Sequence, residues 1–455
     1  MSWEFRRNLW IQLTPQRLIA TPLVLGLLFY AGAEGSVLPV APELLFWMFA
    51  GFWGTRRAAD SITEEVIGAT WPNQRMAAIG AWSMTWGKLF GATAFAWYGA
   101  ALSWIAYAAS AYVEVETVSW VSLPSPGELV SIVAFALLAQ TVALLVALVQ
   151  MRRRRRGRQL ALGLAQWAGL MCLVPFFVVT HSFEPIRLST IWWYGFPFPT
   201  QAFLLFAALL FFAWALVAVH QLMRAELQYR DTTWRLPLFA LFLLGFLTGL
   251  IPAQHLYPFP SATWIAVCGP AMLALYYLTL LAAPGDPIGL MRWGRALGQG
   301  DLRLVGELLP GWMPVGILTL VLGVFAVQHA AALDGWLRLH AVPARLIGQS
   351  VAVWVVCLLA FAARDTLVVL LFAVGRRPER ADVNAVIALG VLHGILPIVF
   401  LSMGLGGNAG LTSPIPGASS SATLAVALGQ SALLALVLAH RMSRLKPRIA
   451  AVAST

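Results

Sequence analysis

The stretch "ELVSIVAFALLAQTVALLVALVQ" (residues 128–150), followed by "MRRRRRGR" (151–158), decides the fold class. A helix needs about 20 apolar residues to cross the hydrocarbon core of a bilayer, and residues 128–150 supply such a run. The arginines that follow would hold the end of this helix on the cytoplasmic side of the membrane. As a stop signal the basic run needs no ligand, and contact between residues 152–158 and anionic lipid headgroups is its natural by-product.

Runs of this kind recur from one end of the chain to the other. The 455 residues are 60% hydrophobic and 11% charged, with a mean hydropathy of +0.78. Only segments whose backbone groups are hydrogen-bonded internally can cross lipid, so the pattern predicts an all-α, polytopic helical membrane protein. We expect about twelve transmembrane helices, at residues 18–33, 38–54, 88–112, 128–150, 160–181, 201–222, 236–252, 262–283, 313–331, 346–363, 384–404 and 421–440.

The distribution of lysine and arginine predicts the orientation. With the N-terminus inside, nearly all basic residues fall in cytoplasmic loops, and only Arg187, Arg338 and Arg345 lie outside. Both termini are then cytoplasmic. The net charge of +11 is spread over the inner loops, so we do not expect a nucleic-acid partner. We expect a multi-pass protein of the cell membrane, the inner membrane of a bacterium.

The segment before the first span has hydrophobic residues that suit a helix lying on the membrane surface. They are Trp3, Phe5, Leu9, Trp10, Ile11 and Leu13. We therefore expect an uncleaved first span that follows an amphipathic N-terminal helix.

The loop at residues 56–88 concentrates charge between two apolar runs. It begins "RRAADSITEEVIGATW" (56–71), where Arg56, Asp60 and Glu64 share one face of a helix. Gly68 and Pro72 would end this helix. A charged helix that protrudes from the membrane suits docking to a soluble partner; a merely solvated loop is the alternative.

The same loop resembles the first cytoplasmic loop of ABC-2-type transporter permeases. The resemblance rests on "DSITEEVIGATW" (60–71) and "QRMAAIGAWSMTWGKLFG" (74–91), and it extends over residues 1–222. In that family this loop forms a coupling helix that binds the ATPase subunit, and a long outer segment, here 181–200, contains short re-entrant helices. The resemblance implies a coupling loop whose residues include Asp60, Glu64, Glu65, Gly68, Thr70, Gly87 and Lys88.

The resemblance also implies a partner. The only lysines, Lys88 and Lys446, lie outside any Gly-x-x-x-x-Gly-Lys phosphate-binding loop. We therefore expect no cofactor and no enzymatic activity in this chain, with ATP-Mg held by a separate P-loop ATPase subunit. That subunit would bind chiefly at 56–88, with 151–159 as a second contact. The family likeness suggests export; the substrate is not readable.

Residues 223–455 form a second predicted six-helix bundle. Its loops 284–312, 375–382 and 404–421 follow the spacing of the loops in residues 1–222. The bundle is either a degenerate second half, which would make one chain a complete transporter, or an accessory bundle on a permease that forms a homodimer.

Several polar residues in or near the spans are candidates for a transport pathway, since charge inside a membrane is costly. Arg364 and Asp365 interrupt "VVCLLAFAARDTLVVLLFAVG" (355–375), either deep in a helix or at its end if the span stops near Ala363. We favour the second interpretation, in which the pair lies at the end of the span. The other candidates are His393, near Pro397, and Glu43. The three cysteines are too scattered for a metal site.

Two other functions remain open. A twelve-helix secondary transporter driven by an ion gradient would need a carboxylate near the middle of the membrane. A multi-pass lipid-modifying enzyme would need convergent acid and base groups at one face. We can place neither set securely from the sequence.

Overall fold

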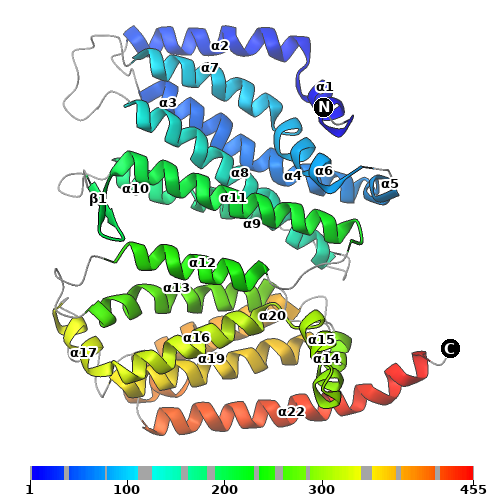
Figure 1. Ribbon diagram of the computed structural model, residues 1–455, viewed down its shortest axis with the longest axis vertical. Helices are drawn as coiled ribbons and strands as arrows, with labels where there is room; N and C mark the ends of the chain where they lie inside the picture. Colours follow the sequence, from blue (N-terminus) through cyan, green and yellow to red (C-terminus); the bar gives the residue numbers. More distant parts are fainter. Residues whose placement is uncertain are drawn as a thin grey trace. The chain divides into compact units, whose positions relative to one another are not determined.

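The computed structural model describes residues 3–34, 40–76, 79–110, 125–154, 162–181, 190–229, 235–251, 260–282, 287–339, 351–375, 381–415 and 421–453. The described chain is almost entirely helical, as predicted, and it divides into two compact units (Figure 1). Unit 1 comprises Met1–Ile191 and Pro197–Asp231, and unit 2 comprises Trp192–Phe196 and Thr232–Thr455.

Unit 1 is built around the long helix α8, against which α4, α9 and α11 pack. Its helices, in chain order, are α1 (Trp3–Gln12), α2 (Pro15–Glu34), α3 (Val40–Phe46), η1 (Trp47–Trp53), α4 (Gly54–Ile67), α5 (Trp71–Met76), α6 (Ala81–Trp86), η2 (Gly87–Gly91), α7 (Ala94–Ser110), α8 (Pro126–Arg154), α9 (Leu162–Met171), α10 (Val174–His181) and α11 (Thr200–Glu226).

Unit 2 is organised around α19, which packs against α16, α20 and α22. Its helices are α12 (Arg235–Gly249), α13 (Pro260–Ala282), α14 (Pro287–Gln299), α15 (Leu302–Glu307), α16 (Trp312–Gln328), α17 (Ala330–Leu339), α19 (Val351–Ala373), α20 (Ala381–Gly390), η4 (Val391–Ile395), α21 (Leu396–Ser402), η5 (Gly406–Leu411) and α22 (Ser421–Ala453).

Seven helices in the described part of the chain are long and apolar enough to cross a membrane, or up to ten if three bent helix pairs each count as one span. One such pair is α1 with α2, bent by 56°, at the place of the expected surface helix and first span. The expected spans 38–54 and 236–252 fall on α3 with η1 and on α12, which are not among the ten. A multi-pass helical membrane protein follows, and the count of twelve stays a prediction.

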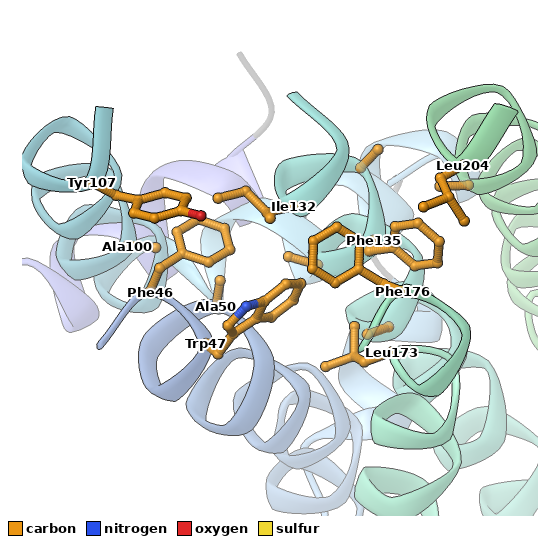
Figure 2. Packing of buried hydrophobic residues seen from close by; sticks show 14 residues of the cluster. Phe46, Trp47, Ala50, Ala100, Tyr107, Ile132, Phe135, Leu173, Phe176 and Leu204 are labelled. Carbon is orange, nitrogen blue, oxygen red and sulfur yellow. The ribbon is translucent and has the colours of Figure 1, made fainter. Parts of the chain in front are cut away.

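Aromatic side chains fill one half of the unit 1 core. Trp47 of η1 packs against α10: its ring lies 5.3 Å from that of Phe176 (Figure 2) and 5.1 Å from that of Phe177. Phe46 and Phe135 lie in the same cluster, which joins α3, α7, α8, α10 and α11. Burial of such large rings contributes much of the packing energy of a helical bundle.

The helix α3–η1–α4 runs without interruption from Val40 to Ile67 through a π-helical segment at its centre. A π-helical turn shifts the backbone hydrogen bonds, so some carbonyls need other donors. Gln140 Nε2 donates to Ala50 O at 2.8 Å, and Gln166 Nε2 donates to Phe52 O at 3.1 Å. The irregular segment is thereby hydrogen-bonded to α8 and α9.

The segment before α11, expected on the outer side, differs from the expectation of short helices. Within its described part, residues 190–199, the strands β1 (Thr190–Trp193) and β2 (Phe196–Pro199) form a hairpin around Tyr194 and Gly195. Isoleucine, tryptophan and phenylalanine favour extended backbone, and a two-residue turn closes it.

Candidate functional site

The charged segment forms a helix, as predicted, but this helix is continuous with the expected second span, as the C-terminal part of α3–η1–α4. The expected span ended at residue 54, but the backbone at Gly54 keeps helical angles (φ −60°, ψ −46°). Beyond this point Ala58, Ala59 and Ile62 are buried in a cluster with residues of α8, α9 and α11. Small residues on one face let α4 approach α8 closely, so the charged residues project from a helix that is held on one side.

A network of four alternating charges ties α4 to α1 and η2. The Lys88 ammonium is fully buried; it forms an ion pair with Glu65 and donates to Ser61 O at 3.2 Å. Arg7 Nη2 donates to Glu65 Oε1 at 2.8 Å and to Glu4 Oε1 at 2.9 Å. Glu4 Oε1 lies 3.8 Å from Lys88 Nζ. The network has no net charge, which offsets the cost of removing these groups from water.

The close approach of α1 to η2 requires glycine. A Cβ on Gly87 would lie 2.7 Å from Glu4 Cγ, and one on Gly91 would lie 3.0 Å from Asn8 Cβ. Asn8 Nδ2 donates to Gly87 O at 3.2 Å across this contact. The Gly-Lys pair at 87–88 therefore has two roles: the glycine makes room for α1, and the lysine bonds to α4.

The end of α4 is closed by a Schellman motif. Thr70 N donates to Glu65 O at 3.0 Å and Ala69 N donates to Val66 O at 3.4 Å, with Ala69 in the left-handed conformation (φ 54°). Thr70 Oγ1 also donates to Glu65 O. The helix ends at Ile67, one residue before the predicted Gly68, but the left-handed residue is Ala69.

Beyond this turn the chain forms an exposed tip, which we define as residues 67–76. Ile67 is 64% exposed and Met76 is 79% exposed. Two apolar side chains at the tip of a charged helix give a partner both contact area and polar surroundings. Trp71 is the buried anchor of the tip, with its ring 5.4 Å from Lys88 Nζ.

Asp60 and Glu64, predicted to share one face of the helix, both bond to arginines of α4, whereas Glu65 has different surroundings. Glu64 is well exposed and accepts from Arg57 Nη1 at 2.8 Å, and Asp60 accepts from Arg56 Nε at 3.2 Å. Glu65 is turned toward Lys88 and Arg7, and only 12% of its side chain is exposed. Of the residues matched to the ABC-2 coupling loop, Glu65, Gly87 and Lys88 lie where α4, η2 and α1 meet beneath the tip. Glu64 lies on the exposed surface of α4.

Sequence reasoning missed Glu4 and Arg7 as members of this network. They were assigned to a surface helix by its hydrophobic residues alone. A signal was present, because Glu4, Arg7 and Asn8 have the i, i+3, i+4 spacing of one helix face. Their partner on a distant segment could not be read from that spacing.

The pathway candidates Arg364 and Asp365 lie in unit 2, inside α19. The interpretation that the helix ends near Ala363 is wrong, since α19 continues to Ala373 and both side chains are buried. Hydrogen bonds from neighbouring elements satisfy the pair, so neither residue needs to reach the membrane surface. His393, in η4, contacts both residues.

Glu43 lies in α3 of unit 1, where its carboxylate accepts from Trp47 Nε1 at 3.3 Å. It belongs to the edge of the aromatic cluster and contacts no residue of the charge network in the described interactions. Among the residues that the structure describes, no group of three or more His, Cys, Asp and Glu side chains could hold a metal ion.

Comparison with protein-family models, with curated proteins and with solved structures finds no match. The likeness to ABC-2 permeases therefore rests on the residues of the loop itself, and its functional meaning is a proposal.

Proposed function

We propose that the chain is the membrane-spanning permease subunit of an ABC transporter in a cell membrane, exporting an unidentified substrate with ATP hydrolysed by a separate P-loop ATPase subunit. The observation that carries the proposal is the exposed tip at residues 67–76, supported by the buried Lys88–Glu65–Arg7–Glu4 network. A docking element must transmit force without bending. Four paired charges and a close helix contact provide that stiffness at the base of the tip.

The charge network also links the tip to the neighbouring helices. Lys88 lies in η2, which forms a bent pair with α7, and Glu4 lies in α1, which forms a bent pair with α2. Movement of α4 would pull on both pairs. Binding of a partner at the tip could in this way alter the arrangement of the helices that we expect to cross the membrane.

A photoreactive side chain in place of Met76 tests the docking role. Trp10, 81% exposed on α1, provides the matched control position. In cells that make the full chain we expect a covalent adduct with a P-loop ATPase at position 76 and none at position 10, identified by peptide mass spectrometry. Absence of an ATPase adduct at both Met76 and Ile67 in a correctly inserted protein would contradict the proposal.

A surface substitution gives an independent check. Ile67→Asp should abolish co-purification of the ATPase, because it places a charge at the centre of the apolar contact, whereas Arg56→Ala on the same helix should not. The ratio of subunits then separates the two architectures: two ATPases per chain for a fused pair of halves, and one per chain for a homodimer.

A carrier driven by an ion gradient is the second candidate. It is favoured by one observation, the fully buried carboxylate of Asp365 within an apolar helix of unit 2. It would transport substrate in vesicles under an imposed proton gradient without any ATPase, which the first candidate would not.

A further inference from the structure

A cluster of polar side chains lies inside unit 2, where α13, α19, η4, α22 and the turn after η5 meet. Its centre is the pair Arg364 and Asp365, 1% and 0% exposed. Both belong to a helix of 23 residues that is otherwise apolar enough to cross a membrane. Charges so placed require partners, and the partners define what the cluster can do.

Arg364 uses four of its five N–H groups on fixed acceptors. Nε and Nη2 donate to Asp365 Oδ1 at 3.0 and 2.8 Å, and Nη1 donates to Thr412 O at 2.8 Å and Gln430 Oε1 at 3.2 Å. One hydrogen on Nη2 remains, and this nitrogen lies 3.1 Å from His393 Nε2. The guanidinium is occupied by protein groups, which argues against an anion as its ligand.

Asp365 is equally well supplied with donors. While Oδ1 accepts from Arg364, Oδ2 accepts from the Tyr277 hydroxyl at 2.6 Å and lies 2.8 Å from His393 Nε2. His393 Nε2 is therefore within hydrogen-bond distance of a donor and of a carboxylate at once.

The two contacts of His393 Nε2 exclude one another. With a hydrogen, Nε2 donates to Asp365; without one, it accepts from Arg364. The other ring nitrogen, Nδ1, lies 3.1 Å from Ser413 Oγ, a hydroxyl that can donate or accept. Only the doubly protonated ring donates from both nitrogens, to Asp365 and to Ser413. The cluster thus offers an acceptor to each N–H group of a charged imidazole. A neutral imidazole has one ring nitrogen without a hydrogen, and this nitrogen accepts from Arg364 or from Ser413.

His393 is also more exposed than the charged pair that it contacts. Its side chain is 29% exposed, whereas that of Asp365 is inaccessible. It lies in the π-helical segment η4, one residue before Gly394 and four before Pro397. Irregular helical turns of this kind are frequent at functional sites.

We propose that His393 is a proton-binding site, with Asp365 and Ser413 as the two acceptors of the protonated ring. A proton from water binds one ring nitrogen and no other covalent bond changes, so the cluster passes from no net charge to a charge of +1. Asp365 favours this step and Arg364 opposes it. The other described contacts of the ring are uncharged: the hydroxyl of Ser413 and the ring of Phe361, whose centroid lies 6.2 Å away. The Tyr277 hydroxyl and the Gln430 amide bond to Asp365 and to Arg364.

The consequence is a dependence of unit 2 packing on pH. When the neutral ring carries its hydrogen on Nδ1, protonation of Nε2 replaces the contact with Arg364 by a hydrogen bond to Asp365, so the bonds that hold η4 to α19 change with pH. The site uses residues of unit 2 alone, and it does not rest on docking of an ATPase in unit 1.

Nuclear magnetic resonance of the full chain in nanodiscs, with ¹³C at the histidine ring Cε1, measures the step directly. The chain has seven histidines, and His393→Gln identifies the signal of interest. We expect the position of that signal to change with pH in a single step, because the ring gains one proton. Ser413→Ala should lower the midpoint, and Tyr277→Phe should raise it because Asp365 Oδ2 then has His393 as its main donor, each by about half a pH unit to one unit.

Both variants avoid an unpaired buried charge, so they should fold. His329 and His440 are internal controls, whose signals should be the same in all variants. A His393 signal that is constant over the pH range, or a midpoint that neither variant moves, would overturn the proposal and leave the cluster a purely structural tie.

Discussion

Lys88 illustrates at the scale of one residue how a buried charge is tolerated in this protein. Removing an ammonium from water costs several kcal/mol, and the cost is offset only by close partners. Lys88 has them on three elements: Glu65 and Ser61 on α4, Glu4 on α1, and the face of Trp71 at the start of α5. The residue therefore determines how α4, α1 and the start of α5 are joined.

Lys88→Met keeps the volume of the side chain and removes its charge. We expect a loss of about 3–5 kcal/mol in stability, because Glu65 and Glu4 then lose the buried ammonium that lies close to both carboxylates. Thermal unfolding in detergent measures this loss. The double variant Lys88→Met/Glu65→Gln restores a neutral network and should be more stable than Lys88→Met alone; additive losses would show that the two residues are not coupled.

Ala69 is the second informative residue, since it occupies a left-handed position that favours glycine. Ala69→Gly should stabilise the end of α4 by about 1 kcal/mol, through relief of the Cβ contact with the backbone. Gly68→Ala, one residue earlier at φ −72°, should bring no such gain. Equal effects of the two substitutions on the melting temperature would contradict the assigned motif.

At the scale of elements, the helix α3–η1–α4 shows why a buried polar side chain can be necessary in an apolar bundle. Gln140 donates to Ala50 O of the π-helical segment and accepts from Trp97 Nε1 at 3.0 Å, which joins η1, α7 and α8. Gly54 leaves space for this amide, because a Cβ there would overlap it. The irregular turn and the glutamine depend on each other.

Gln140→Leu removes both hydrogen bonds without opening a cavity. We expect a loss of about 1–3 kcal/mol, since two buried polar groups lose their partner. Thr141→Val is the matched control, because the Thr141 hydroxyl bonds only to Leu137 O of its own helix. If the two variants unfold at the same temperature, the amide does not support η1.

At the scale of the whole molecule, the described part of each unit contains a cluster of buried charge: Lys88 with its partners in unit 1, and Arg364 with Asp365 in unit 2. Both clusters combine residues from several helices. The clusters differ in the groups that accompany the charges, since only that in unit 2 includes a histidine among the interactions described. Docking and proton binding can accordingly be tested separately.

The predicted orientation of the whole chain can be tested with two exposed arginines. Arg303 on α15 is expected inside and Arg338 on α17 outside, and both side chains are strongly exposed. In a cysteine-free background, Arg338→Cys should react with a membrane-impermeant maleimide in intact cells, and Arg303→Cys only after permeabilisation. Labelling in the reverse order would invert the topology, and labelling of both in intact cells would exclude a span between them.

The sequence by itself determined the class of the protein, a multi-pass helical membrane protein. It also located most helices, because the length of an apolar run and the basic residues at its end are local properties. It also singled out Glu65, Gly87, Lys88, Asp365 and His393 as residues of interest. It could not assign their surroundings, and it placed the end of α19 ten residues too early, since a single charged pair was taken as the end of the helix.

The tertiary structure alone decided which charges meet. Arg7 bonds to a carboxylate 58 residues away, and His393 to one 28 residues away. Such pairings depend on how helices pack, which hydropathy does not encode. A buried charge is stable only where several elements together supply its hydrogen bonds, so its role becomes visible when all of them are in place.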